Sequence, residues 1–417
     1  MKRTIIAVSL CLSAAPAYAV DWSLNSTLTE NVEVNSNPYL RALVAGAFDS
    51  YSDIAANAVA RTPTSKFTFD GDVNYRKYWG PGAEGAPTES LGGSAKLHYE
   101  TYGKNTGDRE YLDADWTRQS TAFALLGELG IVTNSRGFLD TTTVGGGIDR
   151  SLTRLDTVSL AAHSTYTSYD PGGGGTPFID TDASGSWRHH IDPLTTVSAS
   201  SDVEELNFDN SLNTSITILR ENLGLDAAIT RLLSFSGTAG VAYTQTQHGS
   251  PAISLQPISS SGSGSFSDTG FITNLVLTYK MFPDTTVALN AFRTIAPSVV
   301  GSLIETTSVG TNLAYTVNPR ENLSFGLSDS QTTSSGTTAQ YLSASATYGY
   351  SPAREWNTQL SYRYLHRFSE SGVAASGVLF DPVTGLLIPT ASGFGPADSH
   401  SIMLVVSRSV SVLPDGY

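Results

Sequence analysis

The sequence predicts an all-β protein: a transmembrane, antiparallel, up-and-down β-barrel of about 18 strands, or 16, with short periplasmic turns and longer external loops. Three observations predict it. Apolar and polar residues alternate in many segments, as they do in strands, whose side chains point to opposite faces in turn. Short turns recur about every forty residues. Beyond the N-terminus, no apolar run approaches the ~20 residues of a membrane helix, so a membrane crossing requires a closed sheet.

The N-terminus reads "MKRTIIAVSLCLSAAPAYAVDW". Lys2 and Arg3 precede an apolar run that ends in the small-residue motif Ala17-Tyr18-Ala19, which is the pattern of a secretory signal peptide. We therefore expect residues 1–19 to be removed on export and residues 20–417 to form one barrel domain. Cys11 is the only cysteine, so the exported chain has no disulfide and no thiolate metal site.

The exported chain is acidic and sparsely charged. Charged residues make up 15% of the sequence, and 38 glycines accompany many serines and threonines. That composition favours strands and turns over long helices. Removing Lys2 and Arg3 with the signal leaves 22 basic against 38 acidic residues, a formal charge of −16. We expect no nucleic-acid partner, because phosphate binding needs a basic face.

The stretch "KFTFDGDVNYRKYW", residues 66–79, shows the alternation most clearly. Its apolar residues share one side and its charged residues share the other, with Lys77 as the exception. A soluble sandwich would turn the polar face to water, whereas a membrane barrel turns the apolar face to lipid and the charges to a wet lumen. The alternation recurs in "KLHYETY", "LLSFSGTAGVAYTQTQ", "FITNLVLTY" and "WNTQLSYRYLHRF".

Two kinds of connection separate these segments. Eight short joints are built from Pro, small or charged residues: "RTPTSK", "YGKNTGDREY", "SLTRLDTV", "HIDPLTTV", "ITRLLS", "MFPDTTV", "VNPREN" and "SPAREW". Longer and more variable pieces, such as "DPGGGGTPFID", join the opposite strand ends. This asymmetry is typical of outer-membrane barrels. Eight hairpins, a first strand at Trp22–Val34 and a closing strand near Ile402–Val412 make eighteen strands.

Tyrosines and tryptophans gather on the apolar face near strand ends. Neither a soluble sandwich nor a repeat solenoid explains that distribution, whereas it matches the aromatic girdles at the two interfaces of a membrane barrel. Arg408 shares a phase with apolar residues, so we expect it near the periplasmic rim or beside a bulge. The girdle residues are Tyr75, Trp79, Tyr99, Trp116, Tyr166, Trp187, Tyr243, Tyr279, Tyr348, Tyr350, Trp356 and Tyr364.

Several segments together resemble a family of β-barrel porins from proteobacterial outer membranes. They are "ENVEVNSNPYL", "RTPTSKFTFDGDVNYRKYWGPGAE", "LGELGIVT" and the repeated turn-strand units. The resemblance spans the exported chain and implies a barrel in the outer membrane of a Gram-negative bacterium, surrounded by its lipid and placed there by the barrel-insertion machinery. It implies no catalytic residue. The C-terminus departs from the usual terminal Phe and ends "SVLPDGY". Either Val410–Val412 form the strand end, or the insertion signal is degenerate.

The sequence lacks the motifs of catalytic and metal sites. No HExxH, GxSxG or calcium-loop spacing is present among its residues,. His98 lies beside Lys96 and Glu100, which favours a solvated charge cluster over a catalytic base. His189 and His190 are neighbours on a strand and point to opposite faces, so they cannot share a metal. We expect no enzymatic activity and no cofactor, with a hydrolase at the lumen rim as the weakest alternative.

Charged residues of both signs fall on the inferred inward faces. They either wet the lumen and pair across strands, or form opposed walls that set selectivity. The lumen-lining candidates are Lys66, Asp70, Asp72, Arg76, Lys96, His98, Glu100, Asp113, Asp115, Arg188, Arg363 and Arg367.

The sequence thus favours a passive channel for small hydrophilic solutes or for an exported polymer such as a polysaccharide. An acidic chain also predicts a weak preference for cations. The alternative is a closed structural or surface-binding barrel that transports nothing.

Overall fold

The computed structural model describes fourteen stretches of the chain. They are residues 20–38, 40, 44–83, 89–103, 107–121, 137–170, 175–210, 213–247, 265–297, 303–334, 337–368, 378–380, 387–389 and 396–413. The predicted signal peptide and the family-like segment "LGELGIVT" lie outside the described residues.

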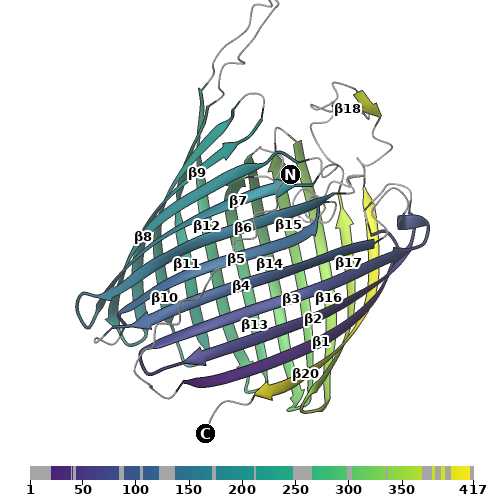
Figure 1. The fold of residues 1–417 in the computed structure, drawn as a ribbon, viewed down its shortest axis with the longest axis horizontal. Coiled ribbons are helices and arrows are strands. Elements are labelled where there is room, and N and C mark those ends of the chain that lie inside the picture. Colours follow the sequence, from purple (N-terminus) through teal and green to yellow (C-terminus); the bar gives the residue numbers. More distant parts are fainter. Residues whose placement is uncertain are drawn as a thin grey trace, which may run out of the picture.

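Eighteen strands form one antiparallel sheet that closes on itself (Figure 1). β1 pairs with β2 along one edge and with β20 along the other. Closure leaves no unpaired strand edge, as a hydrocarbon environment requires. The predicted strand number and the predicted closing strand are both confirmed, and β20 includes Val410–Val412 to its end at Leu413.

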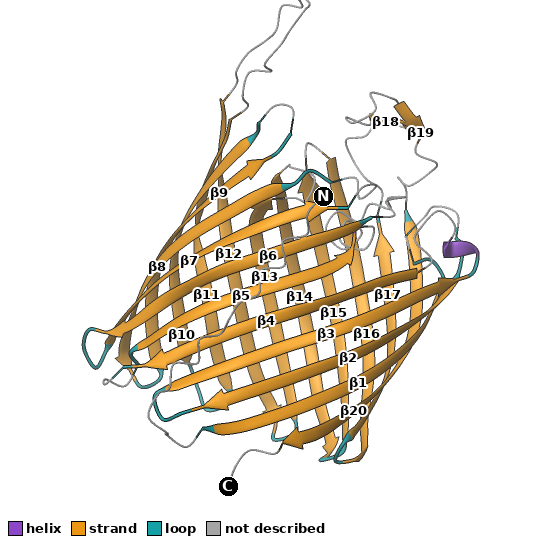
Figure 2. Cartoon of the chain, viewed as in Figure 1, coloured by secondary structure: helices purple, strands orange, loops and turns teal. Residues whose placement is uncertain are grey.

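The barrel strands are β1 (Asp21–Asn35), β2 (Ala47–Arg61), β3 (Ser65–Trp79), β4 (Glu89–Tyr102), β5 (Arg109–Ser120), β6 (Phe138–Ser151), β7 (Asp156–Tyr169), β8 (Phe178–Asp192), β9 (Thr195–Phe208), β10 (Ser215–Ala228), β11 (Leu233–Gln247), β12 (Ser265–Phe282), β13 (Thr285–Pro297), β14 (Leu303–Asn318), β15 (Glu321–Ser334), β16 (Thr337–Ala353), β17 (Trp356–Arg367) and β20 (Ala397–Leu413). A short helix, η1 (Pro81–Ala83), follows β3. Two short strands, β18 (Val378–Phe380) and β19 (Leu387–Pro389), pair with each other beyond the barrel (Figure 2).

All eight predicted short joints connect consecutive strands, and they lie at one end of the barrel, called here the short-turn end. Local side-chain bonds shape several of them. Thr62, Thr153 and Thr230 each accept a hydrogen bond from the backbone N–H three residues later. Asp192 and Asn318 accept one from two residues later. Such turns close a hairpin without a long loop.

The opposite end, called here the long-loop end, is less uniform than the sequence predicts. Residues 121–137 join β5 to β6, and residues 368–396 join β17 to β20. Between β15 and β16, however, only residues 335 and 336 intervene. That hairpin is an exception to the longer connections predicted for this end.

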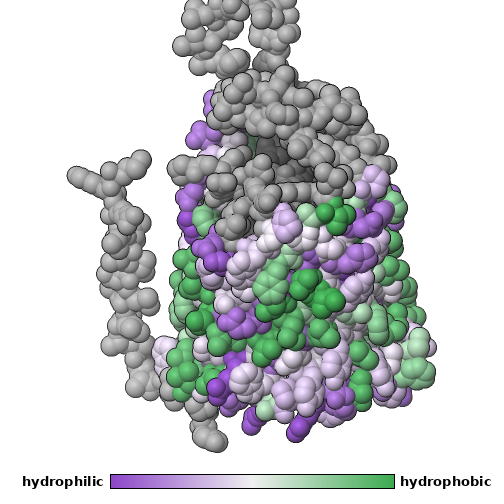
Figure 3. Space-filling view, turned by 90° about the vertical axis from the view of Figure 1, so that its right-hand side faces the viewer, coloured by the Kyte–Doolittle hydropathy of each residue, from purple (hydrophilic) through white to green (hydrophobic). Residues whose placement is uncertain are grey.

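The outer wall is apolar over most of its height. Figure 3 shows one side of it, where hydrophobic residues cover much of the middle and hydrophilic residues gather toward the lower rim. Eleven of the twelve predicted girdle residues are exposed on the outer wall. The twelfth is Tyr364, whose ring centre lies 4.9 Å from that of His400 and whose hydroxyl donates to Asp398 at 2.7 Å. Large apolar side chains are left uncovered by protein on every strand of this face, such as Leu223 at 71% exposure. An apolar belt of this extent requires lipid.

Charged residues on the outer wall are mostly paired at its two rims. Arg408 lies opposite Trp356, the first residue of β17, with its guanidinium 5.5 Å from the centre of the indole ring. Its Nη2 is 3.4 Å from Glu355 in the short turn. The expected place near the rim of the short turns is confirmed. Lys77, the one charged residue on the apolar side of its strand, pairs with Glu89 at 2.7 Å near the long-loop end.

Two glutamates interrupt the apolar belt away from the rims. Glu30 shares a face with Leu28 and Val32, and Ser52 of the next strand donates to it at 2.7 Å. Glu221 accepts from Ser201 in the same way at 2.8 Å. A lipid-facing carboxylate costs less than a lipid-facing lysine or arginine, and each of these has a hydroxyl donor.

An arginine at Leu223 tests whether this wall meets hydrocarbon. Leu223 lies near the middle of β10 on the outer face, so Leu223→Arg should destabilise the folded barrel by ~2–4 kcal/mol. Leu152→Arg, in a short turn at 65% exposure, is the matched control and should change stability by less than about 0.5 kcal/mol. Urea titration in lipid vesicles gives both values. Equal effects at the two sites would contradict a lipid-facing wall at Leu223.

The inner wall contains one apolar cluster. Leu206 and Phe208 of β9 pack with Ile216 and Ile218 of β10, and Ile295 of β13 covers them; all are at most 8% exposed. Arg220, next along the inner face of β10, donates to the backbone oxygen of Ile295 at 3.2 Å. The end of β13 is thereby fastened to the inner wall, so this part of the lumen near the long-loop end is filled by side chains.

No helix among the described residues is long and apolar enough to cross a membrane.

Candidate lumen and its charged wall

The candidates on β3, β4 and β5 lie side by side on the inner face. The register places Lys66 opposite Glu100, Asp70 opposite Lys96, and His98 opposite Asp113. The residues that alternate with them along the same strands, such as Val73 and Leu112, are exposed apolar residues of the outer wall. The alternation therefore assigned these side chains to the correct face, because the pleat of a strand has a strict period of two.

Glu100 is the centre of an ion-pair network near the short-turn end. Lys66 Nζ lies 3.5 Å from it, and Arg109 Nη1 and His98 Nε2 lie 3.6 Å from it. Tyr102 also donates to Glu100 at 2.6 Å. Glu100 is almost completely buried within this group, so its charge is compensated locally and contributes little to the field of the open lumen.

His98 is held between carboxylates. Its Nδ1 lies 2.5 Å from Asp113, and the ring of Tyr111 is stacked at 6.1 Å. The contacts resolved for His98 are thus with acids and an aromatic ring. A hydrolase would need a nucleophilic hydroxyl hydrogen-bonded to the histidine. Among the described residues, no group of three or more metal-ligating side chains could hold a metal ion.

Glycines on β6 make room for this cluster. A Cβ at Gly145 would collide with the ring of His163, and one at Gly147 would collide with the hydroxyl of Tyr111. The stretch "VGGGID" therefore lets neighbouring side chains pack closely, which is a common role of glycine inside a strand.

A group of carboxylates nearer the middle of the wall has fewer basic partners. Asp70 accepts from the amide of Asn57 at 2.5 Å, and Asp72 accepts from Asn74 at 3.0 Å and from Ser94. Lys96 stands opposite Asp70, but its Nζ pairs with Asp115 at 2.9 Å. Uncharged donors satisfy the oxygens and leave the negative charge in place.

Asp53 joins this acidic group and was missed by sequence reasoning. It lies on the inner face of β2 opposite Asn74. Its strand, "AFDSYSDIAANAVAR", has alanine on both faces and two serines on the outer face, so the alternation there is too weak to assign a side. The pair Phe48 and Asp49 is the signal that could have found it. If Phe48 faces lipid, Asp49 and every second residue after it, including Asp53, face the lumen.

A second acidic group lies on β8, β9 and β10. Arg220 pairs with Asp202 at 2.6 Å and with Glu204 at 2.5 Å, and the carboxylate of Asp182 is 3.4 Å from His163. Here one arginine forms ion pairs with two carboxylates. Alternation in "SASSDVEEL" could have revealed Asp202 and Glu204, which share a phase with the serines before them.

The remaining candidates lie elsewhere on the inner wall. Arg76 donates from Nε to Asp49 at 2.5 Å, and Arg363 Nη2 lies 3.5 Å from Glu33. Arg188 is exposed on β8, opposite Thr157 and Ser198.

Arg367 differs from the other candidates. It is only 2% exposed, and its Nη2 donates to the backbone oxygen of Leu40 at 2.9 Å. Its predicted role of wetting the lumen is wrong in this structure, because its side chain is buried and bound to the backbone of Leu40.

The wall formed by β13 to β16 is chemically different from the wall formed by β2 to β5. Among the described residues of these four strands, inward positions carry no charge. Hydroxyls and amides take their place: Asn290, Thr306, Ser308, Asn312, Ser324, Ser328, Ser330, Thr332, Ser343, Ser345 and Thr347. The lumen therefore has a charged wall and a neutral hydroxyl wall.

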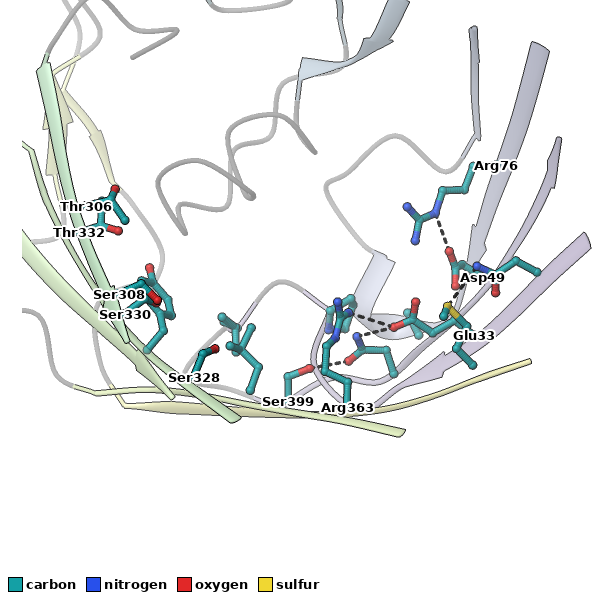
Figure 4. Close-up of a pocket in the computed structure, with 18 of the residues that line it drawn as sticks. Glu33, Asp49, Arg76, Thr306, Ser308, Ser328, Ser330, Thr332, Arg363 and Ser399 are labelled. Atoms are coloured by element: carbon teal, nitrogen blue, oxygen red, sulfur yellow. Dashed lines mark hydrogen bonds and ion pairs between the residues drawn. The ribbon is translucent and has the colours of Figure 1, made fainter. Parts of the chain in front are cut away.

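The two walls meet at a cavity of about 900 Å³ inside the barrel. Figure 4 shows Thr306, Ser308, Ser328, Ser330 and Thr332 on one side and Glu33, Asp49 and Arg76 across the cavity. Arg363 and Ser399 lie between the two groups. Tyr78, Phe292 and Tyr341 also line it.

Apolar side chains outside and a polar, partly hollow interior define the molecule. In architecture it is a porin-like barrel. No protein-family model matches the chain, and no curated protein matches it.

Solved structures of bacterial proteins are similar to this chain over most of its length. Pseudomonas aeruginosa OpdL is 12% identical, with a TM-score of 0.48, over 94% of this chain and 99% of that one. Acinetobacter baumannii OccAB3 is 9% identical, with a TM-score of 0.47, over 93% and 99%. The copper transporter OprC is 11% identical, with a TM-score of 0.45, over 93% and 80%. Similarities of this degree establish neither the family nor the cargo of this chain.

Proposed function

We propose that this protein is a passive channel of the Gram-negative outer membrane for small hydrophilic solutes, with a weak preference for cations. The observation that carries the proposal is the division of the barrel wall into an apolar outer face and a mainly polar inner face around a cavity of about 900 Å³. A barrel of this strand number is wide enough for an aqueous interior. The polar candidates of the charged wall then act on permeating ions, and catalysis plays no part.

The proposal includes the surroundings of the barrel. The aromatic girdles contact outer-membrane lipid, and the barrel-insertion machinery places the chain in the membrane after export. The short-turn end faces the periplasm, as is usual for this class. Small solutes are favoured over an exported polysaccharide because the apolar cluster around Ile218 and Ile295 occupies part of the lumen. A closed structural barrel remains the competing function.

Single-channel recording in planar bilayers tests the proposal. The purified full-length protein should give steady, ohmic openings whose conductance rises with salt concentration. A bilayer that contains correctly folded protein, shown by its resistance to protease, and yet stays silent would favour the closed structural barrel.

A further inference from the structure

We propose that the cavity between the charged wall and the hydroxyl wall is a binding subsite for a small, neutral, polyhydroxylated solute. The inference rests on the proposed channel function and names a solute class for it. It follows from four properties of the cavity: its size, its net charge, its hydrogen-bonding groups and its apolar surfaces.

The size of the cavity suits a small organic solute. At about 900 Å³, it falls within the ~300–1,000 Å³ of typical ligand pockets. Its lining comes from opposite ends of the sequence: Glu33 and Asp49 from β1 and β2, Thr306 and Ser330 from β14 and β15. A solute held in the cavity can therefore contact both walls.

The charges of the cavity cancel. Its lining contains two acids, Glu33 and Asp49, and two guanidinium groups, Arg76 and Arg363. They are arranged in pairs, Arg76 with Asp49 at 2.5 Å and Arg363 with Glu33 at 3.5 Å. Asn35 gives Glu33 a further bond at 3.1 Å. A charged solute would find no uncompensated counter-charge here and would lose hydration on entering, which disfavours ions.

The hydroxyl wall offers donors and acceptors together. Ser308 and Ser330 are directly opposite each other on β14 and β15, and Thr306 and Thr332 form the next such pair. A hydroxyl donates one hydrogen bond and accepts two. Ser308 donates to the backbone oxygen of Asp329 at 3.2 Å, so its hydroxyl oxygen can still accept hydrogen bonds. A solute whose hydroxyls also donate and accept matches this surface.

Apolar surfaces complete the subsite. Tyr78, which is 5% exposed, is packed under the guanidinium of Arg76 at 4.8 Å. Phe292, Tyr341 and Leu365 line the cavity beside the hydroxyls. Carbohydrates carry both hydroxyl groups and C–H faces, so rings and paired polar groups suit them better than they suit a uniformly polar ion.

Interruption of the ion current by sugars tests the inference. Maltotriose added to a bilayer that holds open channels should lower the current with saturation in the millimolar range. Trigalacturonate, a trisaccharide with three carboxylates, should block several-fold less well. The double variant Ser308→Ala with Ser330→Ala should weaken the maltotriose block roughly five- to tenfold, because two hydrogen-bonding groups are lost.

A matched control exists on the opposite side of the barrel. Ser186 and Ser200 form another directly opposed serine pair at inward positions, outside the cavity. Ser186→Ala with Ser200→Ala should leave the block unchanged. Equal block by the two trisaccharides, equal effects of the two double variants, or a current that falls only with solution viscosity would overturn the subsite.

The two proposals fail separately. Bilayers that show no channel openings would overturn the channel function. Calorimetric titration of the detergent-solubilised protein with maltotriose would then decide whether the subsite exists. Heat of binding that disappears in the Ser308→Ala, Ser330→Ala variant would support the subsite in a closed barrel. No heat in the wild type would overturn it.

Discussion

Cysteines at Thr27 and Ser409 should form an intramolecular disulfide in nearly every folded molecule. The two residues are directly opposed on β1 and β20, and their hydroxyl oxygens are 3.0 Å apart. Opposed positions of an antiparallel pair fall within the Cα separation that a disulfide needs. Carried in a Cys11→Ala background, the pair would contain the only thiols in the chain. Non-reducing electrophoresis after heating would show the cross-linked chain as a faster band.

The register of the closing seam is tested at the same time. Thr27→Cys with Ser401→Cys is the matched control, because Ser401 lies opposite Asn35 near the other end of the seam. It should remain uncross-linked. A cross-link in the control instead of the test pair would indicate a shifted seam, and a cross-link in neither would contradict a closed barrel.

Neutralising Asp53, Asp70 and Asp72 should abolish most of the cation preference. Asp70 and Asp72 accept hydrogen bonds from amides and a hydroxyl, and a low-dielectric wall focuses the field of all three carboxylates into the lumen. Conversion of all three to asparagine should lower the potassium-to-chloride permeability ratio about two- to threefold. Reversal potentials in a KCl gradient measure this ratio. The effect should shrink at 1 M salt, where the screening length is only ~3 Å.

The control for this variant removes the same charge from the other face. Glu30→Gln, Glu221→Gln and Asp329→Asn lie at outward positions of β1, β10 and β15. Together they change the formal charge by the same amount as the lumen variant. The permeability ratio should be unaffected, because the lipid-facing charges are separated from the lumen by the wall. Anion preference in the wild type, or equal shifts in the two triple variants, would show that the three aspartates do not set the ion preference.

The strands and the closure of the barrel could be predicted from the sequence because both depend on local patterns. Alternation with a period of two placed Asp70, Lys96 and Asp113 on the inner face correctly, since one slip would turn every apolar neighbour away from lipid. The short joints were recognisable because a hairpin turn depends on a few residues such as Thr62 and Asn318.

The interior could not be predicted to the same extent because it depends on residues distant in sequence. Leu206 and Phe208 share a phase with the inward acid Glu204, so alternation alone would expose them to the lumen. They are buried because residues from other strands, Ile295 of β13 among them, pack with them in one apolar cluster. The hydroxyl wall could not be predicted from the sequence for another reason. Threonine occurs on both faces of β14 and β15, and neither serine nor threonine carries a hydrophobic signal that would assign a side.

Arg367 illustrates the same limit at a single residue. Its position in β17 gave the correct face, but its burial comes from Leu40, which is more than three hundred residues earlier. The pairing of Arg76 with Asp49 likewise joins separate strands. The sequence therefore indicates which residues face the lumen, whereas the three-dimensional structure is needed to tell which of them are compensated.

Solute flux through vesicles is the most direct test of the central claim that the lumen is an aqueous passage. Vesicles that contain the full-length protein would be placed in isotonic solutions of neutral solutes of increasing size, from glycerol through glucose to maltotriose, and their swelling followed by light scattering. The account predicts fast swelling for the smallest solutes and a steep fall with size. Swelling no faster than that of protein-free vesicles, for every solute in the series, would contradict it.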